Sequence, residues 1–263
     1  THPATNLIYQ QFYHEPRFRP ATLMQMQLDA GLLGRKSGQG FYTYEDGKPQ
    51  VENEVSAPDF DGRPVWVSKA EPDSYEKLAA IVHDAGAYLE SGDTPTKAAL
   101  ILVTPIGGDA TDSAVSEGLD ASRVVAVDTL FGLDTRRTLM KTAITKADVA
   151  ATAHALLGGG EVRATIIGDT PGFIAQRVVA TICNIGCSIA QARTAAPEDI
   201  DMAVVLALNY PMGPFSFGDT IGAGTVLRIL KNIQRLTGDP RYRPTAWLRR
   251  RAELGISLVT PEA

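Results

Sequence analysis

The feature of this sequence that most constrains its fold is an alternation of short apolar runs with amphipathic stretches between residues 63 and 169. Runs rich in β-branched residues predict strands at 64–68, 98–104, 123–128 and 163–169, with a weaker strand pattern at 87–90. Helical spacing recurs at 75–85, 109–117 and 146–157. Strands that alternate with helices are typical of a parallel sheet with helices on its faces. We therefore expect a doubly wound α/β unit over residues 63–169.

Strand patterns end after Asp169, and the remaining sequence is predicted to be helical. Apolar residues recur at helical spacing from Phe173 to Ile189 and predict one long helix, with Asp169 or Thr170 as its N-cap. Two more helices are predicted, one that opens at Pro197 and one over residues 223–236. The stretch NYPMGPFSFGD between them reads as a rigid loop. We expect residues 170–258 to form an all-α bundle.

Residues 15–31 and 239–255 repeat each other without a gap, at an offset of 224 residues. EPRFRP in the first copy aligns with DPRYRP in the second, and a glycine closes both copies. Each copy predicts a turn followed by a helix, with Thr245 as the N-cap of the second copy and Gly31 and Gly255 in the left-handed C′ position. The Arg-aromatic-Arg-Pro sequence is expected to brace the entry of that helix. A structural unit has therefore been duplicated.

The duplication predicts four segments. We expect residues 1–45 to be the tail of a first helical domain, 46–62 a linker, 63–169 a degenerate Rossmann-like domain and 170–258 a second helical domain. The chain begins without Met and already inside a helical pattern, so we expect it to be a piece of a longer protein.

Composition excludes several classes of function. The net charge of −5 gives no basic surface for nucleic acid or an anionic membrane, and Arg249–Arg251 is predicted to be a solvated helix face. No apolar run reaches the length of a membrane span and no secretory leader opens the chain, so a cytoplasmic protein is expected. Cys183 and Cys187 are expected to be core thiols, and the scattered histidines form no metal-ligand cluster.

The predicted sheet lacks the glycine fingerprint that dinucleotide binding needs. The first strand runs into KAEPDSYEK, where Glu71 and Asp73 would repel a diphosphate. We therefore expect no cofactor to bind in this chain's own sheet. One alternative remains open: Gly107-Gly108 precedes a helix and could offer amides to a phosphate, although Asp109 is predicted to cap that helix itself.

Several motifs, in order, resemble the C-terminal domain of 3-hydroxyacyl-CoA dehydrogenases: EPRFRP, DTPGFIAQRVV, PEDIDMAV and YPMGPFSFGDTIG. The resemblance covers residues 1–45 and 170–258. It implies a tandem-domain parent that oxidises a 3-hydroxyacyl-CoA to the 3-ketoacyl-CoA with NAD, the oxidoreductase step of fatty acid metabolism by β-oxidation. In single-copy members two helical domains pack as a homodimer. The resemblance thus implies a homodimer, or a pseudo-dimer in which this chain packs against the missing N-terminal half.

The resemblance also identifies residues by position. Family members carry a catalytic His where this sequence has Asp128, and its Glu partner where this sequence has Met140. Both changes disable the family's chemistry, because a carboxylate is a poor base for an alcohol and Met cannot orient an imidazole by charge. The fragment alone is thus expected to be inactive. A separate chemistry by Asp128 with Asp134 remains a minor alternative.

The remaining site residues predicted by the resemblance lie in the second helical domain. Gln176 replaces an Asn that faces the family's active site, and Arg177 is kept. With Gly213, Pro214 and Phe215, they are predicted to line part of the acyl-CoA cleft. The competing hypothesis is that the degenerate sheet is a regulatory module that binds CoA or a nucleotide without turnover.

Overall fold

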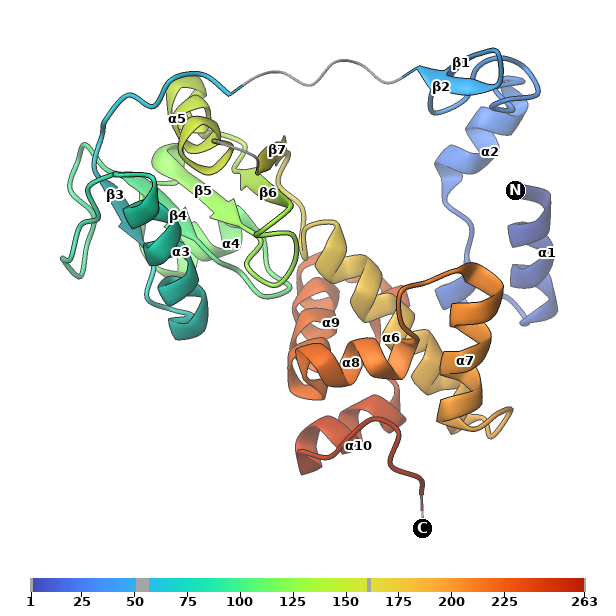
Figure 1. Cartoon of the computed structure of the whole chain (residues 1–263). Helices are drawn as coiled ribbons and strands as arrows, with labels where there is room; N and C mark the ends of the chain where they lie inside the picture. The colour runs from blue at the N-terminus through green and yellow to red at the C-terminus, as the bar shows by residue number, and fades with distance from the viewer. Residues whose placement is uncertain (1, 51–56, 160–161, 263) are drawn as a thin grey trace. The chain divides into compact units, whose positions relative to one another are not determined.

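The structure is a computed structural model that describes residues 2–50, 57–159 and 162–262. Its backbone contacts divide the chain into two units, Thr1–Ser56 and Ala57–Ala263. Figure 1 shows the elements of both units.

The first unit contains the helices α1 (His2–Gln11), η1 (Pro16–Phe18) and α2 (Thr22–Asp29) and the strands β1 (Thr43–Glu45) and β2 (Lys48–Gln50). β1 and β2 pair as an antiparallel hairpin. Asp46 and Gly47 connect them with φ of 49° and 74°, which is the conformation of a two-residue hairpin turn with positive φ at both positions. The predicted linker 46–62 therefore begins with a hairpin, and its residues 51–56 lie outside the described residues.

The second unit begins with a five-stranded sheet in the order β3-β4-β5-β6-β7. Its strands are β3 (Val65–Val67), β4 (Leu100–Val103), β5 (Val124–Val127), β6 (Arg136–Lys141) and β7 (Arg163–Ile167). Three of the pairs are parallel, as predicted, whereas β5 and β6 are antiparallel. A short loop joins β5 to β6, which suits an antiparallel pair, and β6 was not predicted because charged residues open it. The weak strand pattern at 87–90 reduces to one bridge between Leu89 and Val65.

The two faces of the sheet are covered by different helices. Alternate residues of β3 point to opposite faces, with Val65 and Val67 on one side and Trp66 on the other. α3 (Pro72–Asp84) and α5 (Ala147–Leu157) pack on the Val65 face, and α4 (Ala110–Ser116) packs on the Trp66 face. The Rossmann-like class predicted from the sequence is thus confirmed.

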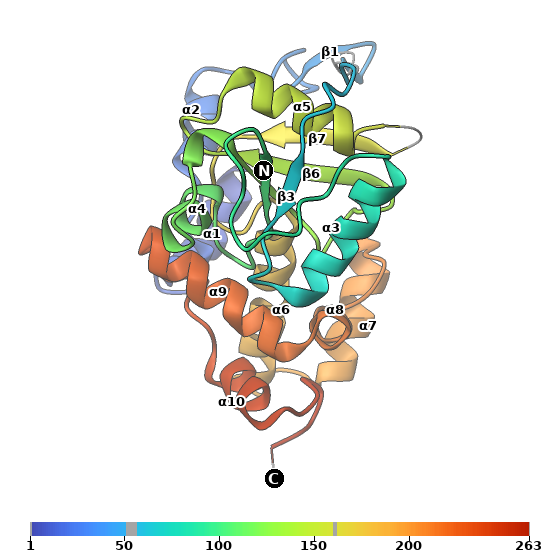
Figure 2. The same ribbon diagram turned by 90° about the vertical axis from the view of Figure 1, so that its left-hand side faces the viewer.

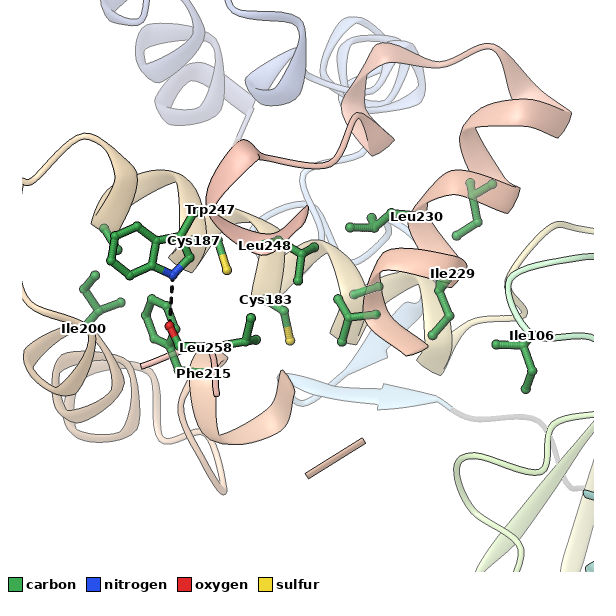
Figure 3. Packing of buried hydrophobic residues seen from close by; sticks show 14 residues of the cluster. Ile106, Cys183, Cys187, Ile200, Phe215, Ile229, Leu230, Trp247, Leu248 and Leu258 are labelled. Carbon is green, nitrogen blue, oxygen red and sulfur yellow. Dashed lines mark hydrogen bonds between the residues drawn. The ribbon is translucent and has the colours of Figure 1, made fainter. Parts of the chain in front are cut away.

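The rest of the second unit is a helical bundle around α6. It comprises α6 (Ala175–Gln191), α7 (Pro197–Leu208), α8 (Pro214–Ile221), α9 (Ala223–Thr237), η3 (Pro240–Tyr242) and α10 (Ala246–Leu254). α6 contacts the other four α-helices of the bundle (Figure 1 and Figure 2). Figure 3 shows their shared core, in which Trp247 donates its indole N–H to the carbonyl of Leu258 at 2.9 Å.

The cysteines are core thiols, as predicted. Cys183 and Cys187 are fully buried, and burial is the largest cause that raises the pKa of both, for Cys187 to about 12.

Two other predictions for the bundle are wrong. The stretch predicted as a rigid loop contains α8, because Pro214 begins a helix. Arg251 is 3% exposed: its guanidinium lies 3.3 Å from the Trp247 ring centroid and hydrogen-bonds the carbonyl of Thr260.

The two copies of the repeat share one backbone geometry. η1 and η3 are both 3₁₀ helices that begin at proline, and the residues two positions before them, His14 and Gly238, have left-handed φ values of 61° and 67°. Gly31 and Gly255 have φ of 70° and 64°, as predicted. Thr245 caps α10 by accepting the amide of Leu248 at 3.3 Å, which confirms the predicted N-cap.

Candidate functional site

The C-terminal end of β5 carries Asp128, where the family resemblance places a catalytic histidine. Only 1% of Asp128 is exposed. Its Oδ1 accepts hydrogen bonds from Nε2 of Gln176 at 3.0 Å and from the amide of Leu130 at 3.1 Å, whereas no partner among the described residues reaches its buried Oδ2. Burial is the largest cause that raises the pKa of this carboxyl, and the bond from Gln176 opposes it. Asp134 is exposed, so the structure does not bring the two carboxylates into one enclosed site.

We expect Asp128→Asn to raise the free energy of unfolding of the chain at pH 8 by about 1 kcal/mol. At pH 5 the gain over the native chain should be smaller. The folded pKa of Asp128 lies above its unfolded value, so the folded chain holds this proton more tightly. Stability from this group is therefore present at low pH and is lost as the pH rises through the folded pKa. Urea unfolding at both pH values measures the difference, and Asp134→Asn is the exposed control. A difference between Asp128→Asn and the native chain that is equal at both pH values would contradict this assignment.

The family resemblance places the Glu partner of the catalytic histidine at Met140, which lies on β6, the strand next to β5. The register pairs Met140 with Ala126 across β5 and β6. Its side chain is fully buried in the cluster that contains Phe173, and its Sδ accepts the amide of Thr170 at 3.1 Å. No acid–base pair can therefore form between these two positions. The histidines of this unit, His83 and His154, lie on α3 and α5.

Gln176 joins α6 to the end of the sheet. It is fully buried, and its Oε1 accepts the amide of Gly107 at 2.8 Å while its Nε2 also lies 3.3 Å from the carbonyl of Pro105. Arg177 bends back over the start of its own helix, where it donates to Oγ1 of Thr170 and to the carbonyl of Phe173. The structure thus brings Gln176 to Asp128, but both polar ends of its amide make structural hydrogen bonds.

Gly213, Pro214 and Phe215 form the start of α8 and lie together in a helix contact. The amide of Phe215 donates to Oδ1 of Asp201 at 2.8 Å, so α7 caps α8. A Cβ on Gly213 would lie 2.3 Å from Cγ of Asp201, which requires glycine there. The Phe215 ring is fully buried in the bundle core (Figure 3). These three residues pack against neighbouring helices, whereas Gln176 contacts the sheet.

The turn after β3, where a dinucleotide fold would seat its diphosphate, is closed by an ion pair. Glu71 precedes α3 and accepts two hydrogen bonds from the guanidinium of Arg228 on α9, which raise the pKa of that arginine. Asn232, one turn further along α9, donates to the carbonyl of Ile106 at 2.8 Å. Arg235 completes the same face of α9 with an ion pair to Asp112 at 2.7 Å. The cavity beside these groups measures about 150 Å³.

Sequence reasoning missed this polar stripe on α9. The i, i+4, i+7 spacing of Arg228, Asn232 and Arg235 places them on one helix face. That spacing alone could have indicated a polar contact face. Their partners lie more than 120 residues away in the sequence, so the pattern could not identify them.

The glycine turn before α4 is also filled by protein groups. Asp109 caps α4 by accepting the amide of Asp112 at 2.7 Å, as predicted. Asp169, predicted to cap the long helix that follows it, instead accepts the amides of Ala110 and Thr111 in α4. The prediction failed because α6 begins only at Ala175, which leaves this carboxylate free to reach the neighbouring helix. Two carboxylates therefore occupy the start of α4.

Among the described residues, no three or more His, Cys, Asp and Glu side chains are grouped in a way that could hold a metal ion. None of the helices formed by residues 2–50, 57–159 and 162–262 combines the length and apolarity that crossing a membrane requires.

The fold and this site define a class: a Rossmann-like sheet followed by a helical bundle, with the ends of the strands closed against the bundle. Comparison with known proteins identifies the family. The 3-hydroxyacyl-CoA dehydrogenase C-terminal domain matches residues 2–44 and 172–257. These two segments therefore belong to the C-terminal domain family of 3-hydroxyacyl-CoA dehydrogenases.

Individual relatives give the extent of the match. A 3-hydroxyadipyl-CoA dehydrogenase of Escherichia coli is 30% identical over 249 residues, which are 94% of this chain and 46% of that protein. A crystal structure of 3-hydroxybutyryl-CoA dehydrogenase from Escherichia coli K12 superposes with a TM-score of 0.72 at 28% identity, over 95% of this chain and 48% of that one. A probable 3-hydroxybutyryl-CoA dehydrogenase of Bacillus subtilis is 36% identical over 89 residues, 34% of this chain and 31% of that protein. The chain thus spans about half the length of the two Escherichia coli proteins that match almost all of it.

Proposed function

We propose that this chain is the non-catalytic C-terminal part of an NAD-dependent 3-hydroxyacyl-CoA dehydrogenase, whose complete form oxidises 3-hydroxyacyl-CoA to 3-ketoacyl-CoA. Relatives that match across almost the whole chain are named as dehydrogenases of 3-hydroxyacyl-CoA substrates and extend beyond it. The observation that carries the non-catalytic role is Asp128, which replaces the catalytic imidazole and is buried and hydrogen-bonded to Gln176.

The chemistry of the family explains why this replacement matters. Oxidation of the alcohol needs a group that removes the hydroxyl proton while NAD accepts the hydride. An imidazole does this near neutral pH, and an adjacent carboxylate keeps it in the correct orientation. Asp128 is enclosed by protein on the side of its Oδ1, and Met140 beside it cannot orient a base. We therefore infer that neither Asp128 nor Met140 replaces the family's acid–base pair in this sheet.

The residues around β3 do not fit NAD. Ligand sites for molecules of this size enclose about 300–1,000 Å³, and the cavity at this position is about 150 Å³. Glu71 and Asp112 line it with negative charge, and the arginines that could offset a diphosphate are already paired with them. We assign NAD to the N-terminal half of the complete protein.

The helical bundle is proposed to form the wall of the acyl-CoA cleft and a dimer-like surface. Gln176, Arg177 and residues 213–215 remain the predicted contribution to the cleft. The surface is supported by α7, where Met202, Leu206 and Leu208 are 59–78% exposed although the helix is largely apolar. A second helical domain, from the missing N-terminal half or from a second copy, is the proposed partner. A cytoplasmic location remains a prediction from the sequence.

The alternative, a regulatory module that binds CoA or a nucleotide without turnover, has less support. This alternative required that the backbone amides of Gly107 and Gly108, before α4, be free to bind a phosphate. The amide of Gly107 donates to Gln176, and two amides at the start of α4, those of Ala110 and Asp112, donate to Asp169 and Asp109. A phosphate would have to displace two carboxylates from the helix start, which is unfavourable for an anion.

Calorimetric titration of the purified chain with NAD and with CoA tests both functions. We expect no saturable heat for NAD with either the native chain or Asp128→Asn. An intact single-copy 3-hydroxybutyryl-CoA dehydrogenase is the positive control. Saturable binding of NAD would contradict the proposal, and saturable binding of CoA without NAD would favour the regulatory alternative.

A further inference from the structure

The first copy of the repeat has a face that the second copy buries. Among the described residues of α1 and α2, none is buried. Large apolar side chains that are 37–61% exposed lie on these two helices or just after them: Leu7, Ile8, Phe12, Leu23, Met26 and Leu28. α9 and α10 correspond to α1 and α2 at the repeat offset of 224 residues, and eight of their residues are buried. The same local fold therefore lacks its partner in residues 2–50.

In the second copy the partner is α6, which binds backbone as well as apolar groups. Asn184 donates to the carbonyl of Arg243 and accepts the amide of Thr245, both at 2.9 Å. Seven residues further along α6, Gln191 accepts the amide of Trp247 at 2.9 Å. These bonds hold the turn between η3 and α10. Small buried residues on α6 let the chain approach closely, namely Ala180, Cys183, Gly186, Cys187 and Ala190.

The first copy presents the equivalent backbone groups in the same geometry. At the repeat offset, Arg243, Thr245 and Trp247 correspond to Arg19, Ala21 and Leu23. Arg19 and Arg243 have φ and ψ within 5° of each other, and Ala21 has the extended conformation of Thr245. Within residues 2–50 the structure gives no acceptor for the amides of Ala21 and Leu23. The positions that Asn184 and Gln191 bind in one copy are thus open in the other.

We propose that residues 15–29 dock on a helix with the chemistry of α6. Its Asn accepts the amide of Ala21 and donates to the carbonyl of Arg19, and its Gln, seven residues later, accepts the amide of Leu23. This inference rests on the proposed function, because the helix is supplied by the part of the complete protein outside this chain. That part is more than half of the relative that matches almost the whole chain, so it is long enough to hold a helical domain of its own. α6 itself is occupied, since α10 already takes both side chains.

The test uses a synthetic peptide of residues 170–195 as the probe, titrated under reducing conditions into the full ¹⁵N-labelled chain. Amide hydrogen exchange at Ala21 and Leu23 is the readout. We expect the peptide to slow exchange at both amides by about tenfold or more. The Asn184→Ala peptide is expected to lose the effect at Ala21 and keep it at Leu23, and the Gln191→Ala peptide the reverse. Equal protection by all three peptides, or protection by none, would overturn the proposal.

A variant of the chain provides a matched control. Ala21→Pro removes only the amide that the partner's Asn would accept, because Ala21 already has φ of −69°, the value that proline requires. We expect Ala21→Pro to leave the spectrum of the free chain unchanged outside its neighbours and to weaken peptide binding about fivefold or more. Binding equal to that of the native chain would contradict the proposed contact. The outcome is separate from the proposed function, since the titration with NAD does not depend on residues 15–29.

Discussion

Replacement of Gly107 by alanine is expected to lower the free energy of unfolding of the second unit by about 3 kcal/mol. Gly107 has φ of 72°, and a Cβ there would lie 2.5 Å from Cα and 2.6 Å from the carbonyl oxygen of Ile229. Backbone of α9 cannot rotate away as a side chain could, so the turn and the helix must separate. That movement would also weaken the bond from the Gly107 amide to Gln176. Urea unfolding monitored by circular dichroism measures the loss.

Gly118→Ala is the matched control for this prediction. Gly118 has φ of 66°, and nothing lies within 4 Å of the position of its Cβ. Gly118→Ala should therefore lower the free energy of unfolding by about 1 kcal/mol, the cost of an alanine with left-handed φ. It adds no clash of the kind that Gly107→Ala makes with Ile229. An equal loss for Gly107→Ala and Gly118→Ala would show that α9 does not approach the turn as closely as the structure has it.

The second large effect is expected for Phe215→Ala, which should cost about 4 kcal/mol of unfolding free energy. The ring is fully buried, and its Cε2 would lie 3.5 Å from a Cβ placed on Gly186 of α6. Its removal leaves a cavity in the core that α6, α8 and α10 share (Figure 3). Chemical unfolding measures this loss in the same way.

Phe217→Ala, two residues further on in α8, is the control for Phe215→Ala. Phe217 is only partly buried and packs at the edge of the same cluster. We expect a loss of less than half that of Phe215→Ala. If the two variants lose the same stability, the bundle core is not centred on Phe215.

Much of the fold could be predicted from local patterns. The apolar runs predicted β3, β4, β5 and β7 within a few residues, and Thr245 and Gly255 marked both ends of α10. β6 was missed because Arg136 and Arg137 open it and it gains strand structure only by pairing with both neighbours. α8 was missed because its proline and glycines have the composition of a turn, and only the bonds from its amides to Asp201 reveal a capped helix.

The site could be predicted in part. The loss of the catalytic pair at positions 128 and 140 stays a prediction, because it rests on the residue types that the family resemblance aligns there. Contacts between distant segments were not predictable: Arg251 turns inward because the Trp247 ring and the Thr260 carbonyl receive it. Asp169 likewise caps a helix that lies 59 residues earlier in the sequence. Such partners are set by tertiary packing, which overrides local preference.

We infer that the sheet of this chain performs no hydride transfer. The most direct test measures NADH formation at saturating NAD and 3-hydroxybutyryl-CoA, first with the purified chain and then with the complete protein from which it comes. We expect the complete protein to be active and the chain alone to be slower by a factor of at least about 10⁴, the upper range of what a positioned acid–base group contributes. A rate for the chain alone that approaches that of the complete protein, and that falls with Asp128→Asn, would contradict the account.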